Sequence, residues 1–154
     1  MIGSLKYAGI YLDLGFNVLI YDLRGHGENE PTYCTYTVRE RKDLRELIKD
    51  TRSRHPDMEL LGLHGESLGA ATSLAVLYYQ PETDFVVSDC AFSDLRMVLE
   101  GGLRSKHIPV SLLSFADIFI KMKYKVSFSG MRPIECLKGN KKPILFIHGQ
   151  NDYL

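Results

Sequence analysis

One serine in this chain stands where a nucleophile could be exposed. Ser67 lies in the segment Gly65-Glu66-Ser67-Leu68-Gly69, between an apolar run and a run of small and apolar residues. A serine on a sharp strand-to-helix turn is a candidate nucleophile, and flanking glycines keep side chains from colliding with the neighbouring strand or helix. A helix N-terminus also favours a developing anion. The pattern therefore predicts Ser67 as a nucleophile; the alternative is a glycine-rich turn with an ordinary surface serine.

The segments on both sides of Ser67 have the patterns that such a turn needs. Leu60, Leu61 and Leu63 indicate a short buried strand before it. Residues 70–77 follow as a helix whose first turn begins with two alanines and can lie close against a sheet.

Strand and helix patterns alternate along the rest of the chain. A helix ends at Gly15, and a capping box of Thr37 and Glu40 opens a charged helix. Further strands are expected at 18–21, 85–87 and 143–147, and a further helix at 94–99. This alternation predicts an α/β fold, a mostly parallel sheet with helices on both faces, and a ligand site at the carboxyl ends of the strands.

The segment 100–131 does not follow the alternation of strand and helix patterns. It carries scattered apolar residues without a strand pattern, and we expect a helical, lid-like insertion. The whole chain, 1–154, is then one partial domain with a core of 1–99 and 132–154. The apolar residues of 108–122 would line an acyl pocket or belong to ordinary buried core, and the sequence favours neither.

Composition gives no sign of several classes of partner. Basic and acidic side chains number 19 each, so no overall field attracts nucleic acid or an anionic membrane. The most apolar stretch, 110–122, is too short to cross a bilayer. Cys34, Cys90 and Cys136 lack the spacing of a disulfide framework or a zinc site. We therefore expect a reducing cytoplasm, no metal and no cofactor; nothing indicates an oligomeric state.

Three motifs together resemble those of the α/β-hydrolase superfamily, which contains serine esterases, thioesterases and peptidase-like enzymes. They are segment 15–27, ending Arg24-Gly25-His26-Gly27; segment 64–69 around Ser67; and segment 143–152, ending in Asp152. The resemblance implies that Ser67 is the nucleophile and that the Leu68 backbone N–H is one oxyanion donor. It implies Asp152 as the triad carboxylate, with Asp89 as the alternative acid.

The resemblance implies a metal-independent acyl hydrolase that acts on a small carboxylic ester through an acyl-serine intermediate. A non-catalytic binding or structural module is the alternative. A dinucleotide-binding domain ranks lower, because Gly62, Gly65 and Gly69 do not give the required glycine spacing.

The chain departs from the family pattern in two places. The catalytic histidine should follow Asp152, but only Tyr153 and Leu154 do, and the five histidines present fit that position poorly. A second departure concerns the sheet. In the family, a strand from earlier in the sequence lies in the sheet between the strand expected at 18–21 and the strand before Ser67, and this chain lacks it. Its absence would leave a gap with unpaired backbone groups or would force its neighbours to pair. We expect the middle part of a longer hydrolase, inactive alone and active once the flanking segments are added.

Overall fold

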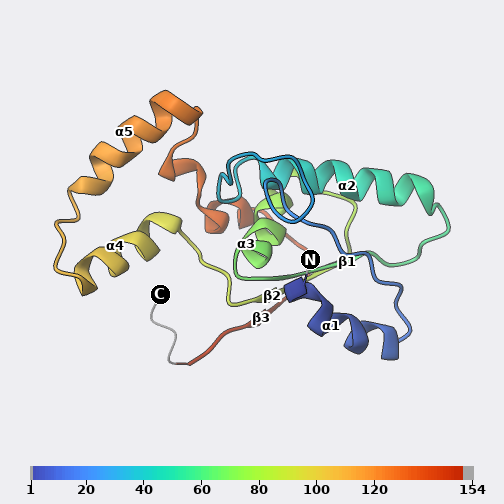
Figure 1. Ribbon diagram of the computed structural model, residues 1–154. Coiled ribbons are helices and arrows are strands. Elements are labelled where there is room, and N and C mark those ends of the chain that lie inside the picture. The colour runs from blue at the N-terminus through green and yellow to red at the C-terminus, as the bar shows by residue number, and fades with distance from the viewer. Residues whose placement is uncertain (1, 151–154) are drawn as a thin grey trace. The chain divides into compact units, whose positions relative to one another are not determined.

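A computed structural model describes residues 2–150 of the chain (Figure 1). The chain divides into two compact units, residues 1–34 and 35–154. The first contains helix α1, Ile2–Asp13, and the second contains the sheet and the other helices.

The end of α1 follows from one glycine. Gly15 has φ +85°, which the absence of a Cβ makes accessible. This conformation lets the N–H of Phe16 donate to the carbonyl of Tyr11 at 2.9 Å and the N–H of Gly15 donate to that of Leu12 at 3.0 Å. The rings of Tyr11 and Phe16 pack edge to face, with centroids 6.2 Å apart. These two bonds and one apolar contact form a Schellman motif, which confirms the predicted end of the helix.

The strand predicted at 18–21 is wrong for the described structure. Residues 16–23 form neither helix nor strand, and residues 2–34 contain no strand that could pair with them. A strand exists through its ladder of hydrogen bonds, so an apolar run alone does not make one.

Helix α2, Glu40–Arg54, begins with a buried carboxylate. Glu40 Oε1 accepts from the N–H of Thr35 at 2.7 Å, and Oε2 accepts from the Thr35 hydroxyl at 2.8 Å and from the N–H of Thr37 at 3.0 Å. The predicted capping box is half correct. Glu40 binds the Thr37 N–H as expected, but the buried Thr37 hydroxyl has no hydrogen-bond partner.

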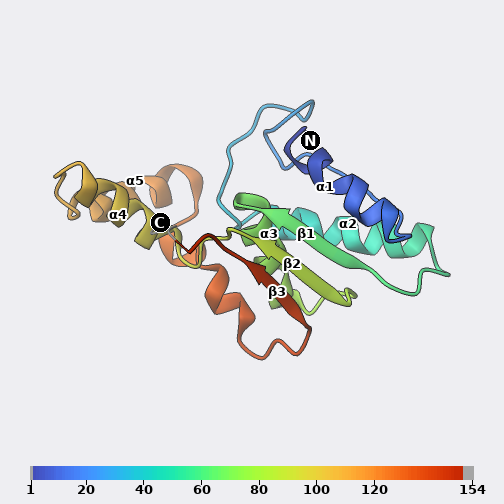
Figure 2. The same ribbon diagram turned by 90° about the horizontal axis from the view of Figure 1, so that it is seen from below.

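Within residues 2–150, three parallel strands form the sheet, in the order β1-β2-β3 (Figure 2). Their bounds are Gly62–Glu66, Phe85–Asp89 and Ile144–Ile147. Because β1 and β2 are in register through Glu66 and Asp89, and β2 and β3 through Asp89 and Ile147, all three strands end at one edge. The predicted α/β fold class and parallel sheet are confirmed.

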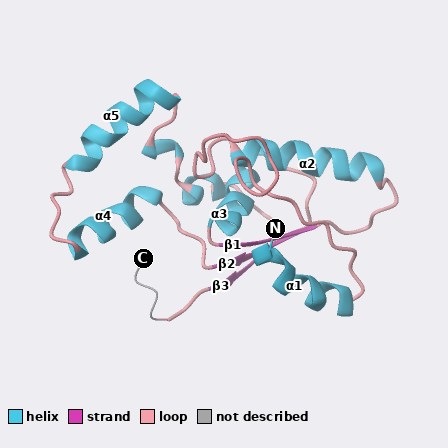
Figure 3. Cartoon of the chain, in the orientation of Figure 1, coloured by secondary structure: helices cyan, strands magenta, loops and turns pink. Residues whose placement is uncertain are grey.

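Helix α3, Leu68–Ala75, continues as the 3-10 helix η1, Val76–Tyr79, and packs on β1 and β2. Figure 3 shows α2 and α3 on the same side of the strands. Leu63, Val86 and Ser88 alternate toward this side, and all three are buried. The other buried apolar residues of this layer are Leu44, Ile48, Ala70, Ala71, Leu74, Ala75, Val76 and Leu77.

The segment after β2 is helical. Helix α4, Leu95–Ser105, is capped by Asp94, whose carboxylate accepts from the Arg96 N–H at 2.9 Å. Helix α5, Leu112–Tyr124, and the 3-10 helices η2, Phe128–Gly130, and η3, Pro133–Leu137, follow. A second buried cluster holds this part together, with members Leu95, Leu113, Val126, Phe128 and Met131.

Within residues 2–150, every helix is too short or too polar to span a bilayer.

The two glycines beside Ser67 differ in what surrounds them. A Cβ at Gly65 would lie 2.2 Å from the carbonyl carbon of Gly69 and 2.4 Å from the nitrogen of Ala70. A Cβ at Gly69 would meet no described heavy atom within 4 Å beyond its own helix. The predicted collision is therefore confirmed for Gly65 and wrong for Gly69. Gly65 is what allows α3 to lie against β1.

The Gly65→Ala substitution should destabilise the protein by about 2 kcal/mol or more, because the new methyl group meets backbone rather than a side chain that can move. Gly69→Ala is the matched control, and we expect it to change stability by no more than about 1 kcal/mol, in the stabilising direction. Urea unfolding measures both. Equal effects at the two glycines would contradict the packing of α3 on β1.

Replacing Glu40 by Gln should cost about 2 to 3 kcal/mol, because the side-chain amide turns an NH₂ group toward backbone and hydroxyl donors in a buried site. Glu46→Gln, at an exposed position of the same helix, should leave the midpoint of thermal unfolding unchanged. Thermal unfolding of both variants checks this, and a Glu40→Gln variant as stable as wild type would show that these hydrogen bonds contribute nothing.

Candidate functional site

Ser67 lies on the turn between β1 and α3. Its backbone has φ 51° and ψ −115°, a conformation that L-residues rarely adopt, and its side chain is exposed. Residues 60–75 are thus a strand, a sharp turn and a helix, as the sequence predicts. The hydroxyl makes no capping hydrogen bond to α3 and remains available at the surface.

Two backbone hydrogen bonds hold Ser67 in this conformation. Its N–H donates to the carbonyl of Asp89 at 2.9 Å, and its carbonyl accepts from the N–H of Ala71 at 2.9 Å. The first ties the turn to β2 and the second begins α3. A residue in such a conformation stores about 1 to 3 kcal/mol, which the surrounding packing must offset.

The amide of Leu68 has a suitable position for an oxyanion donor. Leu68 is the first residue of α3, so its N–H belongs to the first turn, whose N–H groups have no intrahelical acceptor. These groups carry roughly half a positive charge together. A negative oxygen that develops beside Ser67 would be stabilised there.

The carboxyl edge of the sheet brings three residues of different strands side by side. The register places Ser67, Cys90 and His148 each one residue beyond the end of its strand. Cys90 also has a positive φ, 50°, and its N–H donates to the carbonyl of Ile147 at 2.8 Å. Local sequence patterns do not indicate Cys90 as a neighbour of Ser67. No glycine or turn motif marks this position, so only the strand register could have revealed it.

The two candidate acids have different outcomes. Asp152 lies outside the described residues, and its role stays a prediction. Asp89 is the last residue of β2, in register with Glu66, and strand alternation directs its side chain to the face opposite α3. Its backbone carbonyl, rather than its carboxylate, binds Ser67. Its assignment as the alternative acid likewise stays a prediction.

The described histidines lie apart from the Ser67 hydroxyl. Within residues 2–150 no hydrogen bond joins a histidine to Ser67. His148 is exposed at the same edge, but β2 separates it from β1, which places the two backbones about 10 Å apart at two strand spacings. His64 lies on β1 and points to the face opposite Gly65. The described part therefore brings together the candidate nucleophile, Ser67, and the candidate oxyanion donor, the Leu68 N–H, without a histidine hydrogen-bonded to Ser67.

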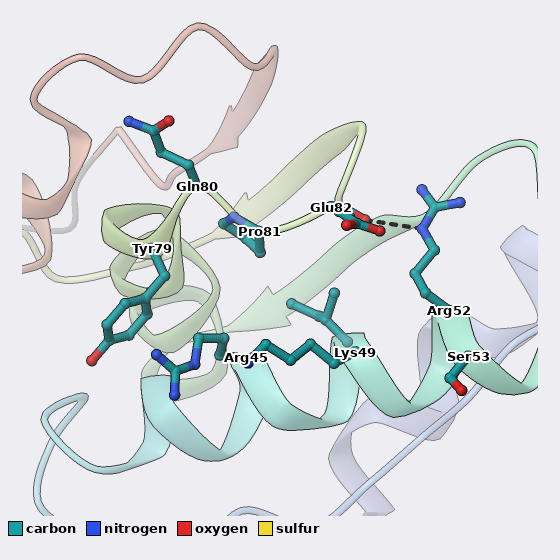
Figure 4. A pocket seen from close by; sticks show the side chains of 9 residues that line it. Arg45, Lys49, Arg52, Ser53, Tyr79, Gln80, Pro81 and Glu82 are labelled. Atoms are coloured by element: carbon teal, nitrogen blue, oxygen red, sulfur yellow. Dashed lines mark hydrogen bonds between the residues drawn. The ribbon is translucent and has the colours of Figure 1, made fainter.

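A groove of about 440 Å³ lies elsewhere on this unit, along α2 and the segment before β2 (Figure 4). Its basic residues are already engaged. Arg52 binds the Asp84 carboxylate at 2.8 Å, and Glu46 binds both Arg45 and Lys49. Hydrogen bonds from Arg45 and then Lys49 lower the pKa of Glu46, so that carboxylate stays ionised and offsets their charge. The groove lies near the amino ends of the strands, away from Ser67.

The described residues also contain no cluster of three metal-ligating side chains.

Comparison with known proteins identifies similar sequences and folds. Residues 7–98 match the family model described as serine aminopeptidase, S33. The uncharacterized protein YqkD of Bacillus subtilis is 35% identical over 99% of this chain and 51% of its own length. The Pyrococcus furiosus esterase Pf2001 is 26% identical, with a TM-score of 0.64 over 95% of this chain and 52% of the esterase. A second crystal form of that esterase gives 22% identity and a TM-score of 0.58, over 96% of this chain and 66% of that one. The chain thus spans about half the length of YqkD.

Replacing Ser67 by glycine should raise stability by about 1 kcal/mol, because glycine adopts a positive φ without the cost that a Cβ imposes. Ser73→Gly is the matched control: Ser73 is buried within α3, where its hydroxyl donates to the Gly69 carbonyl at 2.9 Å. That change should lower stability by about 1 kcal/mol or more. Chemical denaturation compares the two, and a loss of stability in Ser67→Gly would argue against a strained turn.

Proposed function

Because the chain belongs to the serine aminopeptidase S33 family of α/β-hydrolases, we propose that Ser67 is the nucleophile of an acyl hydrolase that cleaves carboxylic esters through an acyl-serine intermediate. The observation that carries the proposal is the exposed serine, held at φ 51° where β1 ends and α3 begins. A conformation this costly is a mark of a functional position.

The reaction divides into two steps. The Ser67 oxygen bonds to the carbonyl carbon as a base takes its proton, and the oxyanion that forms is stabilised by the Leu68 N–H. The carbon–oxygen bond to the alcohol then breaks, and the alcohol leaves with that proton. Water attacks the acyl-serine in the same way and releases the carboxylic acid and free Ser67. In this proposal Asp152 orients the imidazole that acts as the base.

Two observations support an ester rather than a peptide as the substrate. An alcohol leaves more easily than an amine, so an ester makes the smaller demand on a general acid. The solved structure that is 26% identical to this chain is an esterase. The family description names an aminopeptidase, and matched ester and amide substrates distinguish the two reactions.

Labelling with a fluorophosphonate tests the nucleophile directly. We expect mass spectrometry to find the adduct on Ser67 and to find none in Ser67→Ala, because the helix terminus beside this hydroxyl favours the developing anion. Ser114→Ala removes an exposed serine of α5 and is the matched control, which should label like wild type. Labelling of Ser67 no greater than that of Ser114 would contradict a role of the helix terminus in activating this hydroxyl.

Turnover of a p-nitrophenyl ester tests what the 154-residue chain does alone. Without a base in contact with Ser67, we expect an acceleration over water of no more than about 10³ to 10⁴-fold, which is what oxyanion stabilisation and substrate binding supply without a complete triad. Sustained turnover above that level, lost in Ser67→Ala, would contradict this expectation and would require a base within the chain. His148→Ala would then test the histidine at the same sheet edge.

A further inference from the structure

Helix α5 exposes a large apolar surface. We call it the α5 stripe: five side chains that are between half and three-quarters exposed, namely Leu112 at 51%, Phe115 at 70%, Ile118 at 59%, Phe119 at 61% and Met122 at 69%. Single exposed apolar side chains are ordinary, but a contiguous set on one helix marks an interaction surface.

The stripe occupies one side of the helix and leaves the core-facing side to other residues. With 3.6 residues per turn, its five members fall within a sector of about 120°, as wide as the apolar side of a helix packed on a core. The opposite side is apolar too. Leu113 is buried there, and Ala116, Ile120 and Tyr124 pack on the second buried cluster. Helix α5 therefore has two apolar faces, and the described structure covers one.

The charges around the stripe are positive. Lys121 and Lys123 flank its two borders, and Lys125 follows at the end of the helix. Asp117 is the acidic residue of α5, and its carboxylate accepts from the Phe128 N–H at 2.6 Å, which turns it toward the protein. An open hollow of about 590 Å³ combines both properties, since Ile118 and Met122 line it together with Lys121 and Lys125.

We propose that the α5 stripe docks on an anionic lipid surface, with α5 lying flat in the headgroup region. An apolar face bordered by lysines is suited to this position, because the rings and aliphatic chains enter the acyl boundary while the ammonium groups reach anionic headgroups. A second copy of the chain fits less well, since pairing two such stripes brings their lysine borders together. Docking is independent of the proposed hydrolysis, because Ser67 takes no part in it.

Co-sedimentation of the 154-residue protein with vesicles tests the proposal. We expect binding to vesicles of equal parts phosphatidylcholine and phosphatidylglycerol, weaker binding to pure phosphatidylcholine, and weakening by high salt. The Phe115→Ser and Phe119→Ser substitutions should each reduce the partition coefficient roughly tenfold, since each removes a ring that the lipid would bury on docking. Lys121→Glu should reduce it by about fivefold or more, as expected for a charge near an anionic surface.

Matched controls separate docking from general effects. Ile134→Ser removes a side chain of similar exposure from η3, and Lys49→Glu makes the same charge change on α2. Both variants, and Ser67→Ala, should bind vesicles like wild type, and all variants should keep the wild-type far-ultraviolet circular dichroism. Absent binding, or binding unaffected by Phe115→Ser and Phe119→Ser, would overturn the proposal. A dimer in solution that these two substitutions dissociate would assign the stripe to self-association instead.

Discussion

The close approach of α3 to β1 at Gly65 is the constraint on which the rest of the structure depends. With no Cβ at this position, the backbone of Gly69 and Ala70 lies where a side chain would otherwise be. The chain can then reverse sharply within one residue, and Ser67 takes a positive φ while its N–H remains bonded to β2. The exposed hydroxyl, the first turn of α3 and the covered sheet face all follow from this contact.

For the proposed hydrolase, this arrangement separates two parts of the site. Position and electrostatics come from the sheet edge: the end of β1 presents the hydroxyl, and the first turn of α3 presents N–H groups to a developing anion. Proton transfer requires groups that must approach Ser67 from elsewhere, since the histidine at the same edge follows β3, two strands away. The strained turn is thus a feature of the local fold, whereas a working triad requires convergence of distant segments.

Local patterns in the sequence predict the features that neighbouring residues determine. The apolar runs before Ser67 and after Pro143, the glycine that ends α1 and the glycine at 65 all act within a few residues. The strand predicted at 18–21 fails because pairing depends on a partner that the run itself does not encode. The proximity of Cys90 to Ser67 could not be predicted for a related reason, because it depends on the register between β1 and β2. The outward direction of the α5 stripe depends on which of two apolar faces meets the core, and spacing alone does not distinguish them.

A crystal structure of the 154-residue protein would show directly whether the backbone at Ser67 forms the strained turn. We expect a φ near 51°, a hydroxyl open to solvent, and the Gly65 Cα against the backbone of Gly69. A helical or extended φ at Ser67, or a hydroxyl buried in side-chain packing, would contradict it. Either result would remove the reason for assigning chemistry to this serine.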